Sequence, residues 1–339
     1  MLMPSYLEKL KELVSGEFKE HFLNSAAYPS PQNQELLLQR LSELYEVDSN
    51  HIHVTAGADE SIRVISELFC ESEDDKVITH SPTYWSYTKF ARRFQGAVLD
   101  VPLLESKTDF ALNTEKILEE IKHTDGSIKV VNIVNPNNPT GSYFEPDDIR
   151  EIIKAAEEKG ITVVLDEAYI EIAQKPSFIP EMDEYPNLIV LRSLSKAYGL
   201  AGERIGAIIC KNPEFNEALP HVSPMFANTS SSIPLALRAT DPSRQSTVQK
   251  SWDVIAHHRE IIRQAINDNK DMRAFQSHAN LILIGVEDAQ KAFNAFLESG
   301  IAPANPELFG FSRHIRFSLG RQQDTKFIEA AIQAMDLRR

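Results

Sequence analysis

The chain has 339 residues, 42% of them hydrophobic, and a formal net charge of −14, which suits one large or two medium-sized globular domains. The acidic balance argues against a nucleic-acid or anionic-membrane surface, because both call for clustered basic residues. Two cysteines, Cys70 and Cys210, lie far apart in sequence and indicate neither a disulfide framework nor a thiolate metal site, so we expect a protein of the reduced cytoplasm with a small-molecule partner.

The N-terminal region predicts helices followed by a possible anion site. Residues 5–23 place leucine and phenylalanine at helical spacing, and no apolar run in the chain has signal-peptide or membrane-spanning character. Gln34–Tyr45 predicts a second amphipathic helix and Ile52–Thr55 a short strand. The sequence Ala56-Gly57-Ala58-Asp59 then turns into a helical pattern. A strand, a glycine turn and a helix N-terminus together favour bound anions.

Four further strands are predicted to end in polar residues, and helical patterns separate them. The strands are Lys76–His80, Ile128–Val134, Ile161–Leu165 and Asn187–Leu191, and the longest intervening helix runs from about Pro146 to Lys159. This alternation predicts a mainly parallel sheet covered by helices. Such sheets bind ligands at the carboxyl ends of their strands, where the polar turns of this chain would gather.

The stretch from Arg192 to Gly206 concentrates reactive side chains just after a predicted strand. Two hydroxyls (Ser193 and Ser195), an amine (Lys196) and a guanidinium (Arg204) lie close together, separated by glycines that let backbone approach a ligand. Cationic and hydroxyl neighbours favour a lowered pKa for the lysine. An imine-forming lysine needs that property.

The C-terminal part changes character after one more predicted strand, Ile205–Cys210. Loops rich in Pro, Ser and Asn extend from Pro220 to Pro234, and we place a domain boundary there. The elements beyond it suggest a smaller α+β domain; they are a helix at Val248–Asn269, a strand at Asn280–Gly285, a helix at Glu287–Ser299, a strand at His314–Leu319 and a helix at Asp324–Leu337. The expected division is residues 1–26 (N-terminal helices joining the small domain), 27–220 (large domain) and 221–339 (small domain).

Seven short motifs in this order resemble those of the fold type I pyridoxal-phosphate enzymes, and most closely the histidinol-phosphate aminotransferase branch of the class I/II aminotransferases. The resemblance covers residues 23 to 330. It implies an α/β fold of the PLP-transferase type, in which a large domain with a mainly parallel central sheet adjoins a smaller α+β domain. The motifs are Tyr28-Pro, Ala56-Gly-Ala-Asp59, Ser81-Pro-Thr-Tyr84, Asn135-Pro-Asn-Asn-Pro-Thr-Gly141, Asp166-Glu-Ala-Tyr169, Ser193-Leu-Ser-Lys196 with Arg204, and Ile315-Arg316.

The resemblance implies a role for each residue around the cofactor ring. Lys196 would form the imine with pyridoxal 5'-phosphate and then move the substrate α-proton. Asp166 would be the carboxylate partner of the ring nitrogen, because the cofactor works as an electron sink. Tyr169 and Asn138 would hydrogen-bond the phenolic oxygen, and Tyr84 would stack on the ring face.

The resemblance also implies how the phosphate and the substrate are held. Tyr28 would reach the phosphate across the interface of a homodimer, so that a monomer would lack a complete site. Arg316 would bind the α-carboxylate of the substrate in a bidentate manner. The remaining phosphate ligands would be the backbone of Ala58 and Asp59, the hydroxyls of Ser193 and Ser195, and Arg204.

The chain departs from this branch in two places. The usual Asn-x-Asn-Pro-Tyr-Gly turn before the cross-interface tyrosine is missing, because Leu23-Asn-Ser-Ala-Ala-Tyr28 leads almost directly to it, and Pro224-Met-Phe-Ala-Asn228 differs from the usual Pro-Tyr-Asn pattern. Both places belong to the substrate side. The activity expected is an aminotransferase that moves an amino group, with glutamate as donor, to a keto or aldehyde acceptor.

Several alternatives share parts of this pattern. A decarboxylase or lyase of the threonine-phosphate type has nearly all the same motifs. An acylating serine enzyme would use Ser193-Leu-Ser-Lys196, but no Ser-Asp-Asn or Lys-Thr-Gly partner follows. A binding module would keep the scaffold without the chemistry, against which the intact Lys, Asp and Arg argue. We expect no metal site, because His51/His53 and His257/His258 have the wrong spacing.

Overall fold

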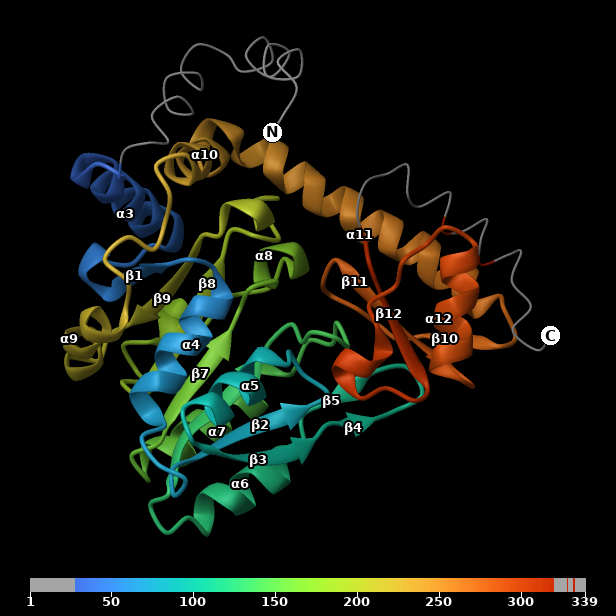
Figure 1. Cartoon of the computed structure of the whole chain (residues 1–339), viewed down its shortest axis with the longest axis horizontal. Coiled ribbons are helices and arrows are strands. Elements are labelled where there is room, and N and C mark those ends of the chain that lie inside the picture. The colour runs from blue at the N-terminus through green and yellow to red at the C-terminus, as the bar shows by residue number, and fades with distance from the viewer. Residues whose placement is uncertain (1–27, 320–327, 329–331, 333–339) are drawn as a thin grey trace.

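The structure is a computed structural model that describes residues 28–319, 328 and 332. Figure 1 shows two units, a large sheet with its helices and a smaller sheet beside it, joined along one side by a long helix. The helices predicted at residues 5–23 and most of the one at 324–337 lie outside the described residues.

The large unit is built on a seven-stranded sheet with the order β1-β9-β8-β7-β6-β2-β3. β9 runs antiparallel to both of its neighbours and the other strands share one direction, which confirms the mainly parallel sheet. The strands are β1 (Ile52–Thr55), β2 (Lys76–Ser81), β3 (Ala97–Pro102), β6 (Ile128–Val134), β7 (Thr162–Asp166), β8 (Leu188–Ser193) and β9 (Gly206–Cys210).

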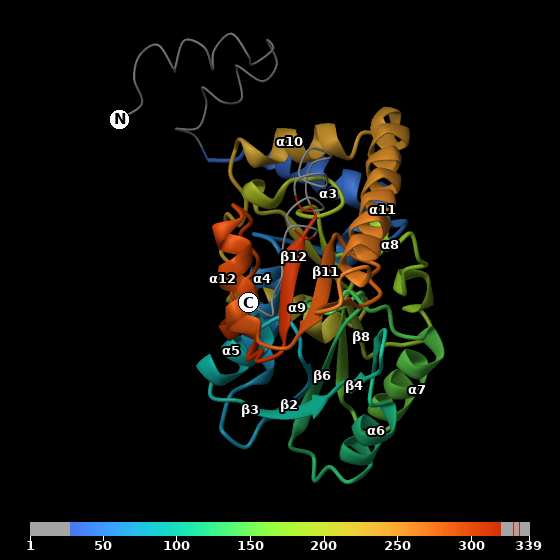
Figure 2. The same cartoon turned by 90° about the vertical axis from the view of Figure 1, so that its right-hand side faces the viewer.

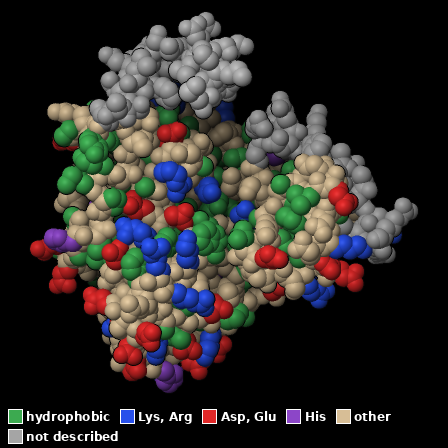
Figure 3. All heavy atoms as spheres, viewed as in Figure 1, with side chains coloured by type: hydrophobic (Ala, Val, Ile, Leu, Met, Phe, Trp, Pro, Cys, Tyr) green, Lys and Arg blue, Asp and Glu red, His purple; other side chains and the backbone are tan. Residues whose placement is uncertain are grey.

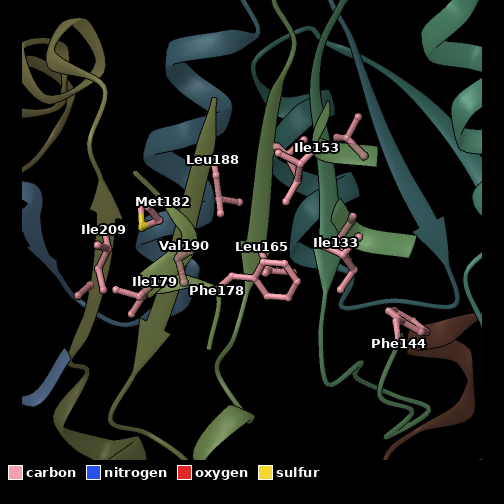
Figure 4. Packing of buried hydrophobic residues seen from close by; sticks show 14 of the residues in the cluster. Ile133, Phe144, Ile153, Leu165, Phe178, Ile179, Met182, Leu188, Val190 and Ile209 are labelled. Carbon is pink, nitrogen blue, oxygen red and sulfur yellow. The ribbon is translucent and has the colours of Figure 1, made fainter. Parts of the chain in front are cut away.

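Helices cover both faces of this sheet because the strands are apolar on both sides. On one face, Ile133, Leu165, Val190 and Ile209 form a row across four neighbouring strands (Figure 4). The helices that bury it are α3 (Pro31–Tyr45), α6 (Thr114–Lys122), α7 (Pro146–Glu157) and α10 (Ser232–Ala239). The other face packs against α4 (Ala58–Phe69), α5 (Ser86–Arg93) and α9 (Pro213–Val222).

The small unit is a three-stranded antiparallel sheet, β10 (Met272–Ala274), β11 (Leu281–Val286) and β12 (His314–Ser318), in that order. One face buries Ile282, Ile284, Ile315 and Phe317 together with residues of α11 (Gln245–Asn267) and α12 (Ala289–Glu298). The view in Figure 2 shows β11 and β12 beside the large sheet with α11 next to them.

The helix α11 belongs to both units. Near its start, buried Trp252 packs with the large core and donates from Nε1 to the carbonyl of Ala197 at 2.8 Å. Near its end, Ile262 and Ile266 lie in the small core.

Some elements were not expected from the sequence. A hairpin of β4 (Leu104–Glu105) and β5 (Phe110–Ala111) follows β3, and short helices occur at α8 (Ile170–Ala173) and at five 3-10 turns: Ser49–His51, Ile179–Glu181, Ala201–Glu203, Pro242–Arg244 and Pro306–Phe309. The region taken as loops, Pro220–Pro234, is partly helical, because α9 continues through Pro220 and α10 begins at Ser232. A proline near a helix end breaks few bonds there, which explains this difference.

The surface agrees with the acidic composition. On the face shown in Figure 3, basic and acidic side chains are interspersed, and no basic stripe is visible there. Among the described residues, no helix combines the length and apolar character needed to cross a bilayer.

Candidate active site

A cavity of about 100 Å³ lies at the carboxyl edge of the seven-stranded sheet. Around it the structure brings together ten of the twelve predicted site residues, from six separate segments: Ala58, Asp59, Tyr84, Asn138, Asp166, Tyr169, Ser193, Ser195, Lys196 and Arg204. Val134, Ala168 and Ala201 also line it. The parallel strands explain this convergence, since β1, β6, β7 and β8 all end at the same edge.

One wall of the cavity is the turn between β1 and α4, and it suits an anion. Gly57 has a φ of 84°, and Ala58 and Asp59 form the first turn of α4, where N–H groups have no intrahelical acceptor. The Arg204 Nη2 atom donates to the Ala56 carbonyl at 3.3 Å and lies 3.7 Å from the Asp59 carboxylate. A Cβ at Gly57 would come within 2.5 Å of that nitrogen, so glycine is required here for the guanidinium to approach.

Two buried hydroxyls face the same wall from the end of β8. Ser193 is the last residue of that strand, and its Oγ accepts from the Ser195 N–H at 3.2 Å. Gly206 pairs with both Ser193 and Thr55, so the end of β8 and the end of β1 flank the start of β9. Helix N-terminus, hydroxyls and guanidinium therefore form one cradle.

Asp166 is a buried carboxylate at the end of β7. Its Oδ2 accepts from the Tyr87 hydroxyl at 2.8 Å and its Oδ1 from the Ala168 N–H at 2.9 Å. Burial raises the pKa of the carboxyl, while these two donors and the more distant Lys196 lower it. No cation among the described residues pairs with Asp166, so the site has a place for a cationic group from a ligand.

Lys196 projects into the cavity opposite these groups. Its Nζ lies 5.5 Å from the centre of the Tyr169 ring and makes no hydrogen bond or ion pair with any described residue. Burial lowers the pKa of this amine, and Arg316 and Arg204 lower it further, against the opposing effect of Asp166 and Asp59. A deprotonated lysine is the nucleophilic form, so the environment favours covalent chemistry.

Arg316 enters from the small unit. Its Nη1 donates to the Asn138 Oδ1 at 2.9 Å, which fixes the amide so that the Asn138 Nδ2 remains as a donor. The Phe309 ring lies 5.5 Å from the Arg316 guanidinium carbon. Burial and Asp166 raise the pKa of the neighbouring Tyr169 hydroxyl while Arg316 lowers it, with burial the larger effect, so Tyr169 stays protonated and is a hydrogen-bond donor.

Tyr84 stands over the cavity at the start of α5. Its hydroxyl donates to the Asp59 Oδ1 at 3.0 Å, and the Ser86 hydroxyl donates to the same oxygen at 2.7 Å. Burial and the Asp59 charge raise the pKa of Tyr84 to about 12. The ring is therefore held by its hydroxyl end, which leaves one face for stacking on a flat ligand.

Tyr28 is the predicted residue that this chain does not bring to its own cavity. Its side chain is 78% exposed and stacks on Phe226 with ring centres 4.6 Å apart. The loop that carries Phe226 is anchored to the cradle, because the Asn228 Nδ2 donates to the carbonyls of Thr55 at 3.2 Å and Arg204 at 3.0 Å.

The sequence reasoning missed two residues that contact the site. Tyr87 could have been found, since it lies three positions after Tyr84 and such spacing repeats on one side of a helix. Asn228 carries no such signal, because it lies in a loop and acts through backbone carbonyls far away in sequence.

The donor set fits a phosphorylated pyridine ring. An uncompensated buried carboxylate suits a protonated ring nitrogen, Tyr169 and Asn138 can donate to a phenolic oxygen, and a tyrosine face is available for stacking. The cradle of α4, the two serines and Arg204 suits a dianion. The unpaired Lys196 amine completes the set that pyridoxal 5'-phosphate requires.

Comparison with known proteins gives an independent result. A family model described as aminotransferase class I and II matches residues 3–334. The histidinol-phosphate aminotransferase 1 of Haemophilus influenzae Rd is 33% identical over 321 residues, covering 94% of this chain and 85% of that protein. The histidinol-phosphate aminotransferase 2 of Mannheimia succiniciproducens is 33% identical over 312 residues, covering 91% and 85%.

Solved structures show the same fold. The histidinol-phosphate aminotransferase from Clostridium acetobutylicum superposes with a TM-score of 0.82 at 24% identity, over 93% of this chain and 92% of that chain. The Sinorhizobium meliloti histidinol-phosphate aminotransferase in complex with pyridoxal-5'-phosphate gives a TM-score of 0.80 at 24% identity, over 94% and 86%.

Proposed function

This chain belongs to the aminotransferase class I and II family, and from that premise we propose that it passes an amino group from glutamate to a keto or aldehyde acceptor, with histidinol phosphate as the first amine to test. It is a pyridoxal-phosphate-dependent transaminase. When bound, the cofactor supplies the electron sink for the bond that breaks at the substrate carbon. The observation that carries the proposal is the unpaired Lys196 amine, which faces the cavity among groups that lower its pKa.

Each residue of the cavity has a proposed task. Lys196 bonds covalently to the cofactor and, once released, takes the α-proton on Nζ and returns it during the second half-reaction. Asp166, held by Tyr87, pairs with the ring nitrogen. Tyr84 stacks on the ring face, and Arg316 binds the α-carboxylate of the amino acid. The other proposed cofactor contacts are Ala58, Asp59, Asn138, Tyr169, Ser193, Ser195 and Arg204.

We further propose a cytoplasmic homodimer in which Tyr28 contacts the cofactor phosphate of the second copy. Three apolar side chains support this assembly by their exposure, since Tyr28, Met225 and Phe226 are 78%, 86% and 41% exposed and lie in or beside the loop that Asn228 ties to the cradle. The domain division at residues 26 and 220 also stays a proposal, and α11, which lies in both cores, would connect the two domains.

The test records the visible absorbance of the purified protein with added pyridoxal phosphate, followed by one amine at a time. We expect glutamate to yield 2-oxoglutarate in a half-reaction, and histidinol phosphate with 2-oxoglutarate to yield glutamate with ping-pong kinetics. Release of carbon dioxide without formation of glutamate would instead indicate the decarboxylase alternative.

The variant Lys196→Ala should lose turnover by at least about 10³-fold, because it lacks both the covalent amine and the base. Lys211→Ala is the matched control, since Lys211 pairs with Asp183 away from the cavity. Full turnover in the Lys196 variant would refute the proposed role.

A further inference from the structure

We infer that Glu105 is a positioning residue for Arg316, acting through an arm of the large unit that holds the small sheet in place. The arm is the β4–β5 hairpin together with its turn, residues 104–111. This inference rests on the proposed role of Arg316 as the α-carboxylate ligand, and it adds the residue that sets where Arg316 stands.

The arm leaves the large sheet after β3 and ends against the small sheet. Figure 1 shows the hairpin extending toward the strands of the small unit. The Thr108 carbonyl accepts from the Gln276 N–H at 2.7 Å, and the ring of Phe110 lies 4.8 Å from that of Phe275. The contact thus combines a backbone hydrogen bond with a buried aromatic pair.

Glu105 adds a two-point charge contact on the same side. Its Oε1 accepts from the Arg273 Nη2 at 2.9 Å and lies 3.5 Å from the His314 Nε2. Arg273 and His314 come from β10 and β12, and both pair in register with Gly285 on the strand between them. One carboxylate from the large unit therefore contacts both edge strands of the small sheet.

The strand β12 carries this contact to the active site. His314 and Arg316 are two positions apart, so their side chains leave the strand on the same face. Ile315 and Phe317, which alternate with them, are buried in the small core on the opposite face. Because that core fixes the strand, the position of His314 against the arm determines the position of Arg316 against Asn138.

The aromatic surroundings restrict movement at this point. The ring of His314 lies 5.3 Å from Phe311, 5.5 Å from Phe275 and 6.1 Å from Phe110. The imidazole is thus enclosed on several sides, and its position relative to the Glu105 carboxylate is defined. By contrast, Glu105 and Arg273 are 40% and 45% exposed, so their pair contributes little to folding and its loss should leave the protein folded.

The experiment measures carboxylate binding apart from turnover. Glutarate has the two carboxylates of glutamate and no amino group, so its binding to the holoenzyme, followed by the change in cofactor absorbance, reports Arg316 without reaction. For Glu105→Gln we expect the Kd of glutarate to rise about two- to thirty-fold, as for residues that act without touching the ligand. The affinity for pyridoxal phosphate and the thermal midpoint should not change.

Two further variants make the test specific. Arg273→Gln should raise the same Kd, and the double variant should be no worse than the stronger single one, because both remove one contact. Glu287→Gln removes an equal charge from an exposed side chain that has no ion-pair partner among the described residues, and it should bind glutarate normally.

The outcomes separate this inference from the proposed function. If Arg316→Lys weakens glutarate binding and Glu105→Gln does not, the positioning role is overturned and the carboxylate role of Arg316 stands. If neither variant weakens it, both are overturned. If Glu105→Gln lowers the affinity for pyridoxal phosphate as much as that for glutarate, the arm acts on the whole fold, which also overturns the inference.

Discussion

The two sides of the cavity are built in different ways. On the side of the seven-stranded sheet, Asp166, Ser193 and Tyr87 are almost fully buried and are fixed by hydrogen bonds. On the side of the three-stranded sheet, a single described strand contributes Arg316, which is held by Asn138 and, as we infer, by a partly exposed arm. The cofactor side is therefore rigid, while the substrate side depends on weaker contacts that can change without loss of the fold.

The ion pairs behind each side show the same difference. Arg192, next to Ser193, points to the reverse face of the sheet, where it pairs with Glu167 at 3.1 Å and Glu171 at 2.6 Å and lies against the Tyr45 ring at 4.6 Å. These three charged side chains are between 1% and 9% exposed, whereas Glu105 and Arg273 are 40% and 45% exposed. A buried charge that loses its partner is costly, and an exposed one is not.

The largest expected effect is on the buried network. Arg192→Met should lower the free energy of unfolding by about 3–5 kcal/mol, because it leaves two buried carboxylates without their cation. Urea unfolding of the apoprotein measures it. Arg273→Met, the exposed counterpart, should cost less than about 1 kcal/mol, and equal losses for the two variants would contradict the comparison.

The next effect is on the substrate side. Arg316→Lys should raise the KM for glutamate about 10- to 100-fold, since an ammonium cannot make the bidentate contact with a carboxylate. The pyridoxal phosphate affinity should stay at the wild-type value. Steady-state kinetics and an absorbance titration measure these two quantities, and a parallel loss of both would place Arg316 on the cofactor side.

A third effect depends on pH and lies beneath the cofactor side. Buried His80 accepts from the Val134 N–H at 3.1 Å, and burial lowers the pKa of His80 from 6.5 to about 3. Between these values the unfolded chain binds a proton that the folded chain does not, so stability falls as the pH drops below 6.5. At pH 5 this amounts to about 2 kcal/mol.

The variant His80→Gln keeps an acceptor for Val134 and removes the titration. Its free energy of unfolding should fall less than that of the wild type between pH 7.5 and pH 5. Buried Asp166 and Glu167, whose pKa values are raised, act in the opposite sense, so the difference between the two proteins is the relevant quantity. Identical pH dependence would show that His80 does not titrate in this window.

The smallest effect concerns the second shell of the cofactor. Tyr87→Phe removes one hydrogen bond to Asp166 and should weaken pyridoxal phosphate binding about fivefold, which corresponds to roughly 1 kcal/mol. Equilibrium dialysis of the apoprotein measures it. Tyr185→Phe, a buried tyrosine of the opposite core, serves as the control and should bind the cofactor normally.

The sequence predicted the cofactor side well because strands and turns carry local signals. The apolar runs that end at Val134, Asp166 and Ser193 lie within a few residues of the observed strand ends, and a parallel sheet places such ends together. The 97–102 strand was missed because its burial is only partial. The arm was missed too, since its strands are two residues each and its contacts join residues more than 150 positions apart.

The position of Trp252 gives the protein a built-in optical reporter. The chain has two tryptophans: Trp252 is bonded to the carbonyl next to Lys196, and Trp85 adjoins Tyr84. A chromophore seated between Lys196 and Tyr84 would accept excitation energy from both indoles. Quenching of intrinsic fluorescence should therefore follow cofactor loading without any label, and in Trp85→Phe the remaining emission would follow the Lys196 loop alone.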